Sequence, residues 1–346
     1  MAQESELGPR RGGLAGPGWD EVHLVHQSLP ELALNEIDLS TAVAGVRLGS
    51  PVIINAMTGG APGVEAINRD LAVAARELGL AMALGSQTAG LKEPAVASTY
   101  RVVREVNPGG VFLANVSAEA SVAQARAAVE MVEADLLQIH LNAPQELQMA
   151  EGDRDFRGQI ERISLIVQEL EVPVVVKECG FGLSKESTRL LYQAGVRAVD
   201  LSGRGGTNFA WIEMARREGE DLDPGLTHWG IPTACALAEV AALELPGLDL
   251  IASGGIAYGS EAAKALALGA CAVGVAGGVL KRQQEGGLQA TRRYLERLLD
   301  DLRAAVLLAG ARDLPALQRR PVVLTGGVGE WCRLRGVDLT GLANRT

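Results

Sequence analysis

The sequence has 346 residues, of which 47% are apolar, so the chain is long enough to bury a sizeable core. Aromatic residues make up only 3% and glycine fills 42 positions, a composition typical of closely packed α/β layers and unsuited to stacking single-stranded nucleic acid. Asp and Glu number 42 against 32 Lys and Arg, and the net charge of −10 disfavours nucleic acid and anionic membranes as partners.

The first 20 residues are rich in glycine and proline and lack the apolar segment of a secretory signal peptide. No apolar run reaches the roughly 18 residues that a membrane-spanning helix needs. The four cysteines are far apart and form no CxxC pair, as in reduced cytoplasmic proteins. We therefore expect a soluble cytoplasmic chain, with a flexible segment over residues 1–20 and a single domain over residues 21–346.

Short apolar runs alternate with amphipathic segments from residue 51 onward. Eight runs are predicted to be strands covered on both faces, at 51–57, 81–86, 111–117, 136–142, 173–178, 198–203, 249–255 and 272–277. Eight β/α units in about 230 residues predict a closed (β/α)8 barrel, the TIM-barrel fold, preceded by an N-terminal extension. An open doubly wound sheet is the alternative, but the first run continues as AMTGGAPG rather than as a GxGxxG turn.

Several helix boundaries are also predicted. Ser121, Ser184 and Ser260 each precede a helical pattern and are expected to be N-caps. Leucines spaced along residues 288–309 predict one apolar face of a C-terminal closing helix, whereas residues 310–346 have a less regular pattern.

Polar residues stand at the carboxyl ends of seven of the eight predicted strands. They are Thr58, Ser86 with Gln87, Asn115, His140 with Asn142, Lys177, Ser202 and Ser253. Because chemistry in a (β/α)8 barrel lies at this end, the pattern predicts a pocket for one polar ligand. The alternative is a set of polar loop residues that bind nothing.

Lys177 shares a strand face with Val175, and a charged residue at the end of a strand is expected to face the pocket. Such a lysine would anchor a phosphate, form a Schiff base or stabilise a reduced flavin. Pairing with a nearby carboxylate is the purely structural alternative.

Two glycine-rich turns, SGGIAYGS and AGGVL, follow the seventh and eighth strands and precede helices, an arrangement typical of the phosphate site of this fold. The long loop after the sixth strand, about 203–230, carries Phe209, Trp211 and Trp229 and is expected to be a lid. Tight turns without a ligand are the alternative for the glycines.

The fourth strand ends in HLNAPQELQ, which places His140, Asn142, Gln145 and Glu146 within seven residues. His and Asn side chains bind phosphate oxygens, and one carboxylate beside them would hold Mg²⁺ through a diphosphate. An ordinary capped loop is the alternative.

Taken together, the motifs resemble the type 2 isopentenyl-diphosphate isomerases. The similar segments are AMTGG, GSQ, HLNAPQE with EGDRDF, VKECGFGLS, DLSGRGGTNFAWIE, WGIPT and ASGGI…AKALALGA, within a resemblance that covers about residues 29–338. The α-hydroxyacid oxidases share only the wider flavin-barrel pattern and would show a histidine in a SNHGGRQ-like loop, which reads SGRGGTN here. Inosine-monophosphate dehydrogenase would need a nucleophilic cysteine in a glycine-rich loop, and none fits.

The resemblance implies an FMN-dependent isomerase that converts isopentenyl diphosphate to dimethylallyl diphosphate in isoprenoid biosynthesis. It implies Mg²⁺, NADPH as the reductant of the flavin, and a homo-oligomer, a tetramer or an octamer. His140 and Asn142 would hold the substrate, Gln145 would contact it near the reacting carbons, and Glu146 would bind Mg²⁺. The implied FMN contacts are Ala56, Met57, Thr58, Ser86, Asn115, Lys177, Ser202, Thr207, Gly255, Ile256, Ala257, Ala276 and Gly277.

The sequence departs from the family at three cationic positions. The usual Arg-Lys pair with a following Glu-His is matched poorly by Arg10–Arg11, GSQR reads GSQT with Thr88, and the turn that often carries arginine has Ala257. Each charge-assisted hydrogen bond contributes roughly 1.5–3 kcal/mol, so two losses would weaken substrate binding by about a hundredfold or more. Arg10, Arg11 or Arg204 would have to compensate.

These departures keep two other hypotheses open. The first is a paralogue on the same flavin barrel that acts on a different prenyl substrate or transfers hydride. The second is a flavin-binding protein without turnover, which retention of His140, Asn142, Gln145 and Glu146 disfavours.

Overall fold

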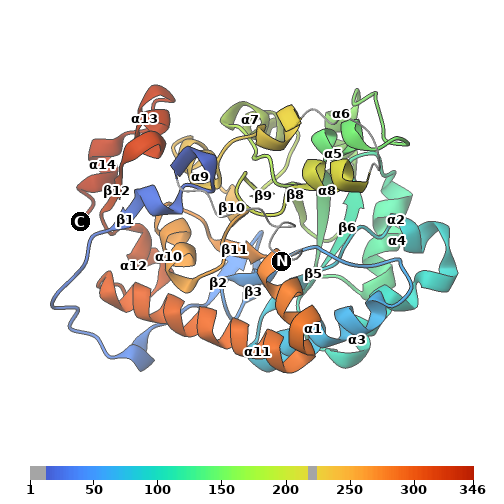
Figure 1. The fold of residues 1–346 in the computed structure, drawn as a ribbon, viewed down its shortest axis with the longest axis horizontal. Helices are drawn as coiled ribbons and strands as arrows, with labels where there is room; N and C mark the ends of the chain where they lie inside the picture. The colour runs from blue at the N-terminus through green and yellow to red at the C-terminus, as the bar shows by residue number, and fades with distance from the viewer. Residues whose placement is uncertain (1–12, 217–223) are drawn as a thin grey trace.

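The structure is a computed structural model that describes residues 13–216 and 224–346. Eight parallel strands form one closed barrel that helices surround (Figure 1). Around the barrel the strands are β10 (Asp249–Ser253), β11 (Ala272–Val275), β4 (Val52–Ile54), β5 (Ala81–Ala83), β6 (Phe112–Ser117), β7 (Leu136–Leu141), β8 (Val174–Glu178) and β9 (Ala198–Asp200). Each lies within one of the eight predicted runs, so the expected (β/α)8 barrel is confirmed.

Both faces of the barrel strands are buried, which explains their unbroken apolar sequences. In β7, Leu137 and Ile139 belong to the core between barrel and helices, whereas Leu136 belongs to a separate cluster inside the barrel. The N-terminal extension contributes a hairpin of β2 (Thr41–Val43) and β3 (Val46–Leu48), and both of its ends join the inner cluster. The hairpin therefore covers the amino end of the barrel, opposite the end where the polar residues were predicted.

The helices follow the expected alternation. They are α1 (Val64–Leu78), α2 (Thr88–Lys92), α3 (Ser98–Val106), α4 (Val122–Val132), α5 (Ala143–Gln148), α6 (Gln159–Glu169), α7 (Lys185–Gln193), α8 (Phe209–Arg216), α9 (Thr233–Ala241), α10 (Gly259–Ala267), α11 (Gly277–Leu308), α12 (Leu314–Gln318), α13 (Gly326–Leu334) and α14 (Leu339–Ala343). Among the described residues, no helix is both long enough and apolar enough to cross a membrane.

Two of the three predicted N-caps are confirmed. The side chains of Ser121 and Ser184 each accept the N–H three residues later, at 3.3 and 3.1 Å. The third prediction is wrong, because Ser260 lies inside α10 and Tyr258 occupies the N-cap position. The Glu261 carboxylate there accepts the N–H of Tyr258 at 3.1 Å, so a first-turn acid satisfies the helix end in place of a serine hydroxyl.

Non-helical backbone at Gly286 and Gly287 breaks α11 into two parts. The second part is the closing helix predicted over 288–309, and its Leu295 and Leu302 are buried as the leucine spacing requires.

Residues 13–20 and the tail 310–346 form more regular structure than their sequence pattern predicts. The tail folds as α12, β12 (Val322–Leu324), α13 and α14, and β12 pairs antiparallel with β1 (Val22–Leu24) beside the barrel (Figure 1). Residues 13–20 lie within the segment expected to be flexible, but here they pack on the barrel and bury Trp19, which is 1% exposed. Residues 1–12 lie outside the described chain.

Candidate active site

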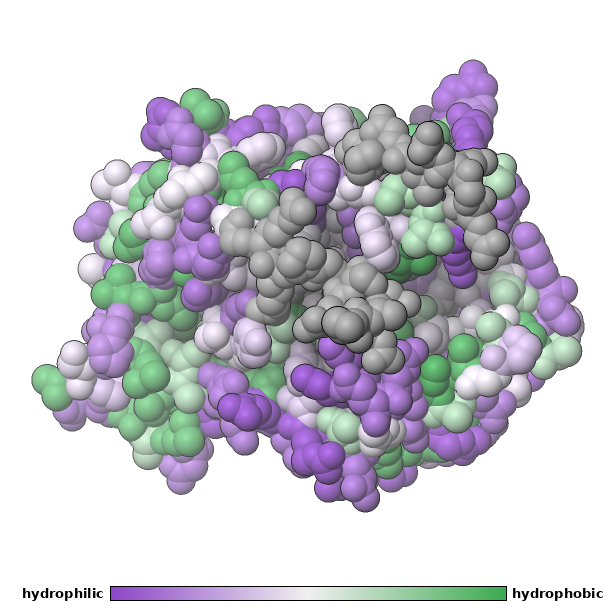
Figure 2. All heavy atoms as spheres, viewed as in Figure 1, coloured by the Kyte–Doolittle hydropathy of each residue, from purple (hydrophilic) through white to green (hydrophobic). Residues whose placement is uncertain are grey.

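A cavity of about 590 Å³ opens at the carboxyl end of the barrel. That volume lies in the usual range for small-molecule sites. Its walls come from the ends of β4 to β8, from α2 and α5, and from Phe209 at the start of α8. Figure 2 shows this face hollowed just below α8, close to the end of β6.

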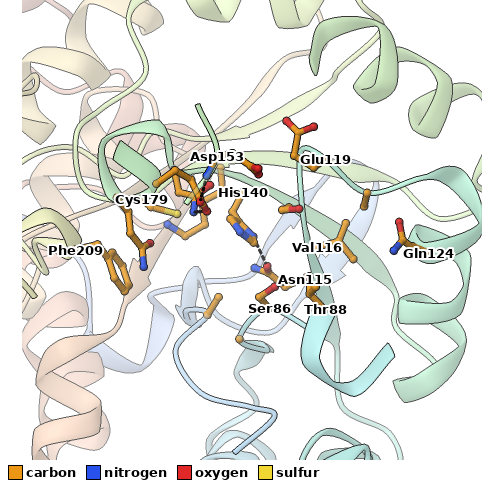
Figure 3. A pocket seen from close by; sticks show the side chains of 18 of the residues that line it. Ser86, Thr88, Asn115, Val116, Glu119, Gln124, His140, Asp153, Cys179 and Phe209 are labelled. Atoms are coloured by element: carbon orange, nitrogen blue, oxygen red, sulfur yellow. Dashed lines mark hydrogen bonds between the residues drawn. The ribbon is translucent and has the colours of Figure 1, made fainter. Parts of the chain in front are cut away.

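Many of the residues predicted for the site line this one cavity, and Figure 3 shows several of them converging from different strands. Those that line it are Ala56, Met57, Ser86, Asn115, His140, Asn142, Gln145, Glu146 and Lys177. Part of the set implied for the flavin therefore shares one space with the residues implied for the substrate.

The other predicted flavin contacts do not line the cavity. They are Thr58, Ser202, Thr207, Gly255, Ile256, Ala257, Ala276 and Gly277. The Thr58 hydroxyl donates to the Asn68 side chain at 2.7 Å, and the Ala257 N–H donates to the Glu261 carboxylate at 2.8 Å. Ile256 is buried in the core.

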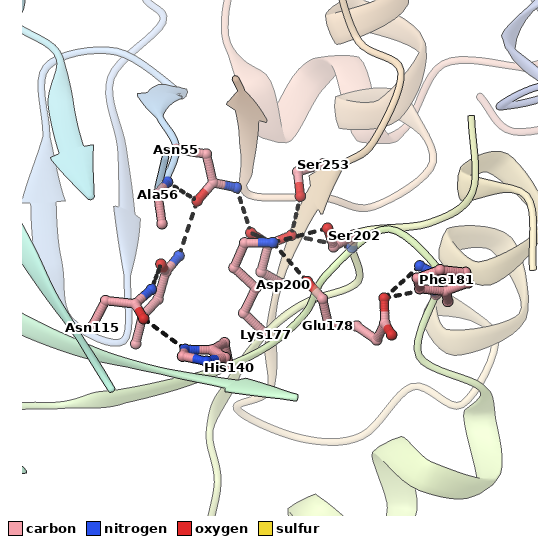
Figure 4. Close-up of polar contacts among 12 residues, drawn as sticks. Asn55, Ala56, Asn115, His140, Lys177, Glu178, Phe181, Asp200, Ser202 and Ser253 are labelled. Carbon is pink, nitrogen blue, oxygen red and sulfur yellow. Dashed lines mark hydrogen bonds and ion pairs between the residues drawn. The ribbon is translucent and has the colours of Figure 1, made fainter. Parts of the chain in front are cut away.

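Lys177 reaches from β8 into a buried polar layer of the barrel (Figure 4). Its Nζ donates to the Glu178 carbonyl at 2.6 Å and to the Ser202 hydroxyl at 2.9 Å, and it lies 3.9 Å from the Asp200 carboxylate. Ser202 itself has a φ of 38°, a left-handed backbone that non-glycine residues rarely adopt. The carboxylate-paired lysine that the sequence left as an alternative is present, and the lysine still lines the cavity.

His140 is held on the cavity wall by Asn115, whose side-chain oxygen lies 2.8 Å from the histidine Nδ1 (Figure 3). Burial, and to a lesser extent the charge of Lys177, lowers the pKa of His140 to about 4, against a smaller opposing effect of the Val116 carbonyl. The ring is therefore neutral at physiological pH.

The loop after β7 is tied together by side-chain amides. Asn142 donates to the Glu146 carboxylate at 2.7 Å, and the second oxygen of that carboxylate accepts the Asp153 N–H at 3.0 Å. Gln145 donates through Nε2 to the carboxylate of Glu213 on α8 at 3.0 Å. The expected substrate-contacting amide is therefore oriented by a residue from the loop after the sixth barrel strand.

That loop only partly matches the predicted lid. Phe209 lines the cavity and Glu213 contacts Gln145, but Trp229 is 64% exposed and lines nothing there. Arg204 also does not line the cavity, since its guanidinium donates to the carbonyls of Leu14 and His228. It holds the N-terminal segment and supplies no cation to this site.

Sequence reasoning missed several polar residues of the site. They are Asn55, Lys92, Gln138, Asp200 and Glu213. Side chains two residues apart on a strand lie on the same face, so Gln138 and Asp200 could have been predicted from His140 and Ser202. Lys92 lies four residues after Thr88 on α2, which is the spacing of one helix face, and both residues line the cavity.

Comparison with known proteins identifies the class. The FMN-dependent dehydrogenase family matches residues 113–324, and the chain belongs to that family. Solved structures with the same barrel include a mandelate oxidase, with a TM-score of 0.66 and 19% identity over 90% of this chain and 91% of that one. A lactate oxidase of Pediococcus acidilactici gives a TM-score of 0.68 at 16% identity over 90% of this chain and 86% of that one.

Much closer relatives define the branch of the family. Isopentenyl-diphosphate delta-isomerase of Symbiobacterium thermophilum is 69% identical over 99% of this chain and 94% of that protein. The isopentenyl-diphosphate delta-isomerase of Bacillus pumilus is 46% identical over 97% of this chain and 94% of that protein. Within the flavin barrels the chain thus belongs with the isopentenyl-diphosphate delta-isomerases, which confirms the resemblance found in its motifs.

The residues present fit the FMN that this family uses. Asn115 and Lys177 provide donors on the cavity wall for polar atoms of a flavin ring. The turn after β10 has φ values of 101° at Gly254 and 75° at Gly255, and a Cβ added to Gly206 would lie 2.6 Å from the Gly255 nitrogen. Only glycine backbone allows that approach, and such a turn beside the start of α11 suits a phosphate.

Proposed function

We propose that this chain isomerises isopentenyl diphosphate to dimethylallyl diphosphate, with FMN in its reduced form and with Mg²⁺. The observation that carries the proposal is the cavity itself, in which Lys177 and Asn115 lie with His140, Gln145 and Glu146. Membership among the isopentenyl-diphosphate delta-isomerases, at up to 69% identity to a relative, supports the same conclusion.

Moving the double bond requires a proton to be added at one carbon and removed at another, with positive charge developing between the two events. Reduced FMN supplies an electron-rich ring that stabilises such a charge. The ammonium of Lys177, fixed by Ser202 and Asp200, would hold the anionic form of that ring in the cavity. Gln145 would orient the reacting carbons, and Glu213 limits the positions that its amide can take.

The substrate's diphosphate would be bound at the end of β7. His140 and Asn142 line that part of the cavity, and Glu146 would hold the Mg²⁺ that neutralises charge on the diphosphate. Magnesium commonly uses one or two carboxylates together with substrate phosphates, and Asp153 lines the same cavity. The described residues form no group of three His, Cys, Asp or Glu suited to a metal, in keeping with a metal that binds with its substrate.

A direct assay tests the function. The purified chain, loaded with FMN and reduced by NADPH without oxygen, is incubated with isopentenyl diphosphate and Mg²⁺, and dimethylallyl diphosphate is measured by chromatography. We expect product only when the flavin is reduced. If the chain holds reduced FMN and forms no product, the isomerase proposal is wrong. The result would then favour a paralogue with another prenyl substrate, the alternative that the missing cations at Thr88 and Ala257 support.

The resemblance also implies a cytoplasmic homo-oligomer, and we propose a tetramer or an octamer. Light scattering of the FMN-loaded chain during size-exclusion chromatography measures this directly. A monomer at micromolar concentration would contradict it.

Changing Glu146 to glutamine is expected to raise the Mg²⁺ concentration needed for half-maximal rate by tenfold or more, because the amide has lost the charge that attracts the cation. The measurement is the isomerisation rate as a function of Mg²⁺. Glu151→Gln, on the same loop but outside the cavity lining, is the matched control and should leave the curve unchanged. Equal activity of the native chain with and without a chelator would exclude the metal.

Lys92 offers a replacement for the cation missing at Thr88. The two residues line the cavity one helical turn apart. We expect Lys92→Ala to raise the KM for isopentenyl diphosphate about tenfold at low salt, and less at high salt because the site is exposed.

Adding Thr88→Arg to the Lys92→Ala variant should lower the KM again, since it returns a cation to the same helix face. Lys281→Ala, on α11 outside the cavity lining, is the control for loss of one surface lysine. An unchanged KM in Lys92→Ala would show that Lys92 does not bind the diphosphate. Arg10 or Arg11, which lie outside the described residues, would then be the candidates.

A further inference from the structure

Three buried amides join the carboxylate of Asp200 to the ring of His140 (Figure 4). The Asn55 amide donates to Asp200 at 2.7 Å, Gln138 donates to the Asn55 carbonyl at 3.2 Å, and Asn115 donates to the Gln138 carbonyl at 3.0 Å. The Asn115 carbonyl then meets His140 Nδ1 at 2.8 Å. All three amides are at most 3% exposed, so water does not compete for these bonds.

In this series of hydrogen bonds, the carboxylate of Asp200 at the buried end decides which group donates and which accepts. Asp200 is fully buried, lies 3.9 Å from the Lys177 ammonium and accepts the Ser253 hydroxyl at 2.6 Å, so it acts only as an acceptor. Asn55 must therefore turn its NH₂ toward Asp200. The backbone N–H of Ala56 donates to the Asn55 carbonyl at 2.9 Å and independently supports the same orientation.

Each amide has one carbonyl and one NH₂ group, so an orientation fixed at Asn55 passes to Gln138 and then to Asn115. The Asn115 oxygen is thereby turned toward His140, where it can only accept a hydrogen bond from the ring. We propose that Asp200 is a positioning residue for His140, which acts through the three amides to fix the ring proton on Nδ1 and to leave Nε2 unprotonated for the ligand.

This arrangement has a consequence for an anionic substrate, which rests on the function proposed above. A neutral ring of this tautomer has only a lone pair on Nε2 and cannot donate to a phosphate oxygen. Binding of a diphosphate there takes one proton from solvent onto Nε2, and the imidazolium then donates N–H to a phosphate oxygen. The proton is returned to solvent when the product leaves.

Charged and polar groups around the His140 ring shift the equilibrium between its neutral and protonated forms. Lys177 on β8 disfavours the imidazolium, while the carbonyls of Asn115 and Val116 on β6 favour a ring N–H. The remaining charged residues that line the cavity are Lys92, Glu119, Glu146 and Asp153. The bound dianionic phosphate is the added charge that shifts the balance toward protonation.

The tautomer is tested by nitrogen NMR on the FMN-saturated full chain, with label only in its four histidines. The His140 signals are identified by their absence in a His140→Asn variant. At pH 7 without substrate we expect a protonated Nδ1 and an unprotonated Nε2. A protonated Nε2, alone or as the imidazolium, would overturn the proposal without reference to any variant.

The relay is tested in the same spectrum by changing Gln138. Methionine has a similar volume but no hydrogen-bonding amide, so Gln138→Met frees Asn115 to rotate, and the Nε2–H tautomer should become populated. Gln138→Glu should restore the native pattern, because a protonated buried carboxyl also has one accepting and one donating oxygen. Ser253→Ala removes a bond to the other oxygen of Asp200 and should change nothing at His140. A native pattern in Gln138→Met would show that Asp200 does not act on His140.

Proton uptake is measured by titration calorimetry of isopentenyl diphosphate and Mg²⁺ into the oxidised FMN complex, in buffers of different ionisation enthalpy at pH 7. The terminal phosphate, with a second pKa near 6, is already mostly ionised there and releases few protons of its own. We expect uptake of more than half a proton per site, falling in Gln138→Met. Binding without uptake would refute the coupling. Binding with uptake but no isomerisation would reject the proposed function and leave the relay standing.

Discussion

Replacing Gln145 with leucine is expected to lower the isomerisation rate by at least about 100-fold while FMN remains bound, a loss typical of removing a group that acts on the reacting atoms. Gln145 lines the cavity and is held by Glu213 at 3.0 Å, so its amide is positioned before the substrate arrives. Leucine has nearly the same size but neither donates nor accepts. The measurements are kcat in the reduced-flavin assay and the visible spectrum of bound FMN.

The matched control is Gln148→Leu, the same change on α5 at a residue that does not line the cavity. It should keep most of the activity. Equal rates for Gln145→Leu and the native chain would remove Gln145 from the site.

Changing Lys177 to methionine is expected to abolish tight FMN binding and to lower the free energy of unfolding by about 3 kcal/mol, because removing one partner of a buried ion pair leaves the other charge uncompensated. The charge left behind is that of Asp200, whose side chain is fully buried. Flavin retention is measured after dialysis, and stability by urea unfolding of the flavin-free chain.

The double change Lys177→Met with Asp200→Asn separates the two effects. It removes both charges, so the unfolding free energy should return toward that of the native chain while FMN binding stays weak. Recovery of FMN binding in the double variant would show that Lys177 serves only to neutralise Asp200.

The barrel could be predicted from sequence because each of its strands is buried on both faces. A run such as VVVKE in β8 has no polar alternation, and only a parallel sheet covered by helices buries such a run completely. The cap at Ser260 was predicted wrongly because a serine and a first-turn glutamate are both good helix starts, and the chain uses Glu261. Local preference alone does not distinguish the two.

The site was predictable where a residue's own strand places it, as for His140 and Lys177. It was not predictable where a contact joins strands far apart in the chain. Asn55 and Asp200 are separated by 145 positions and meet only because β4 and β9 lie in one barrel. The packing of Pro17 against Gly205 and Gly255 is likewise invisible in a Gly/Pro-rich segment whose composition is typical of a flexible chain.

The pairing of β1 with β12 has a consequence for biosynthesis. Glu21 accepts the N–H groups of Thr325 and Val328 at 3.0 and 2.7 Å, so the N-terminal segment is held by residues made about 300 positions later. At translation rates of roughly 5–20 residues per second, that segment waits some 15–60 s for its partner. The glycine turn after β10 is made late in that interval, and it lacks the cover of Pro17 until β12 follows and the N-terminal segment pairs with it. A nascent chain therefore completes the packing of this end of the barrel only after β12 and α13 have been made.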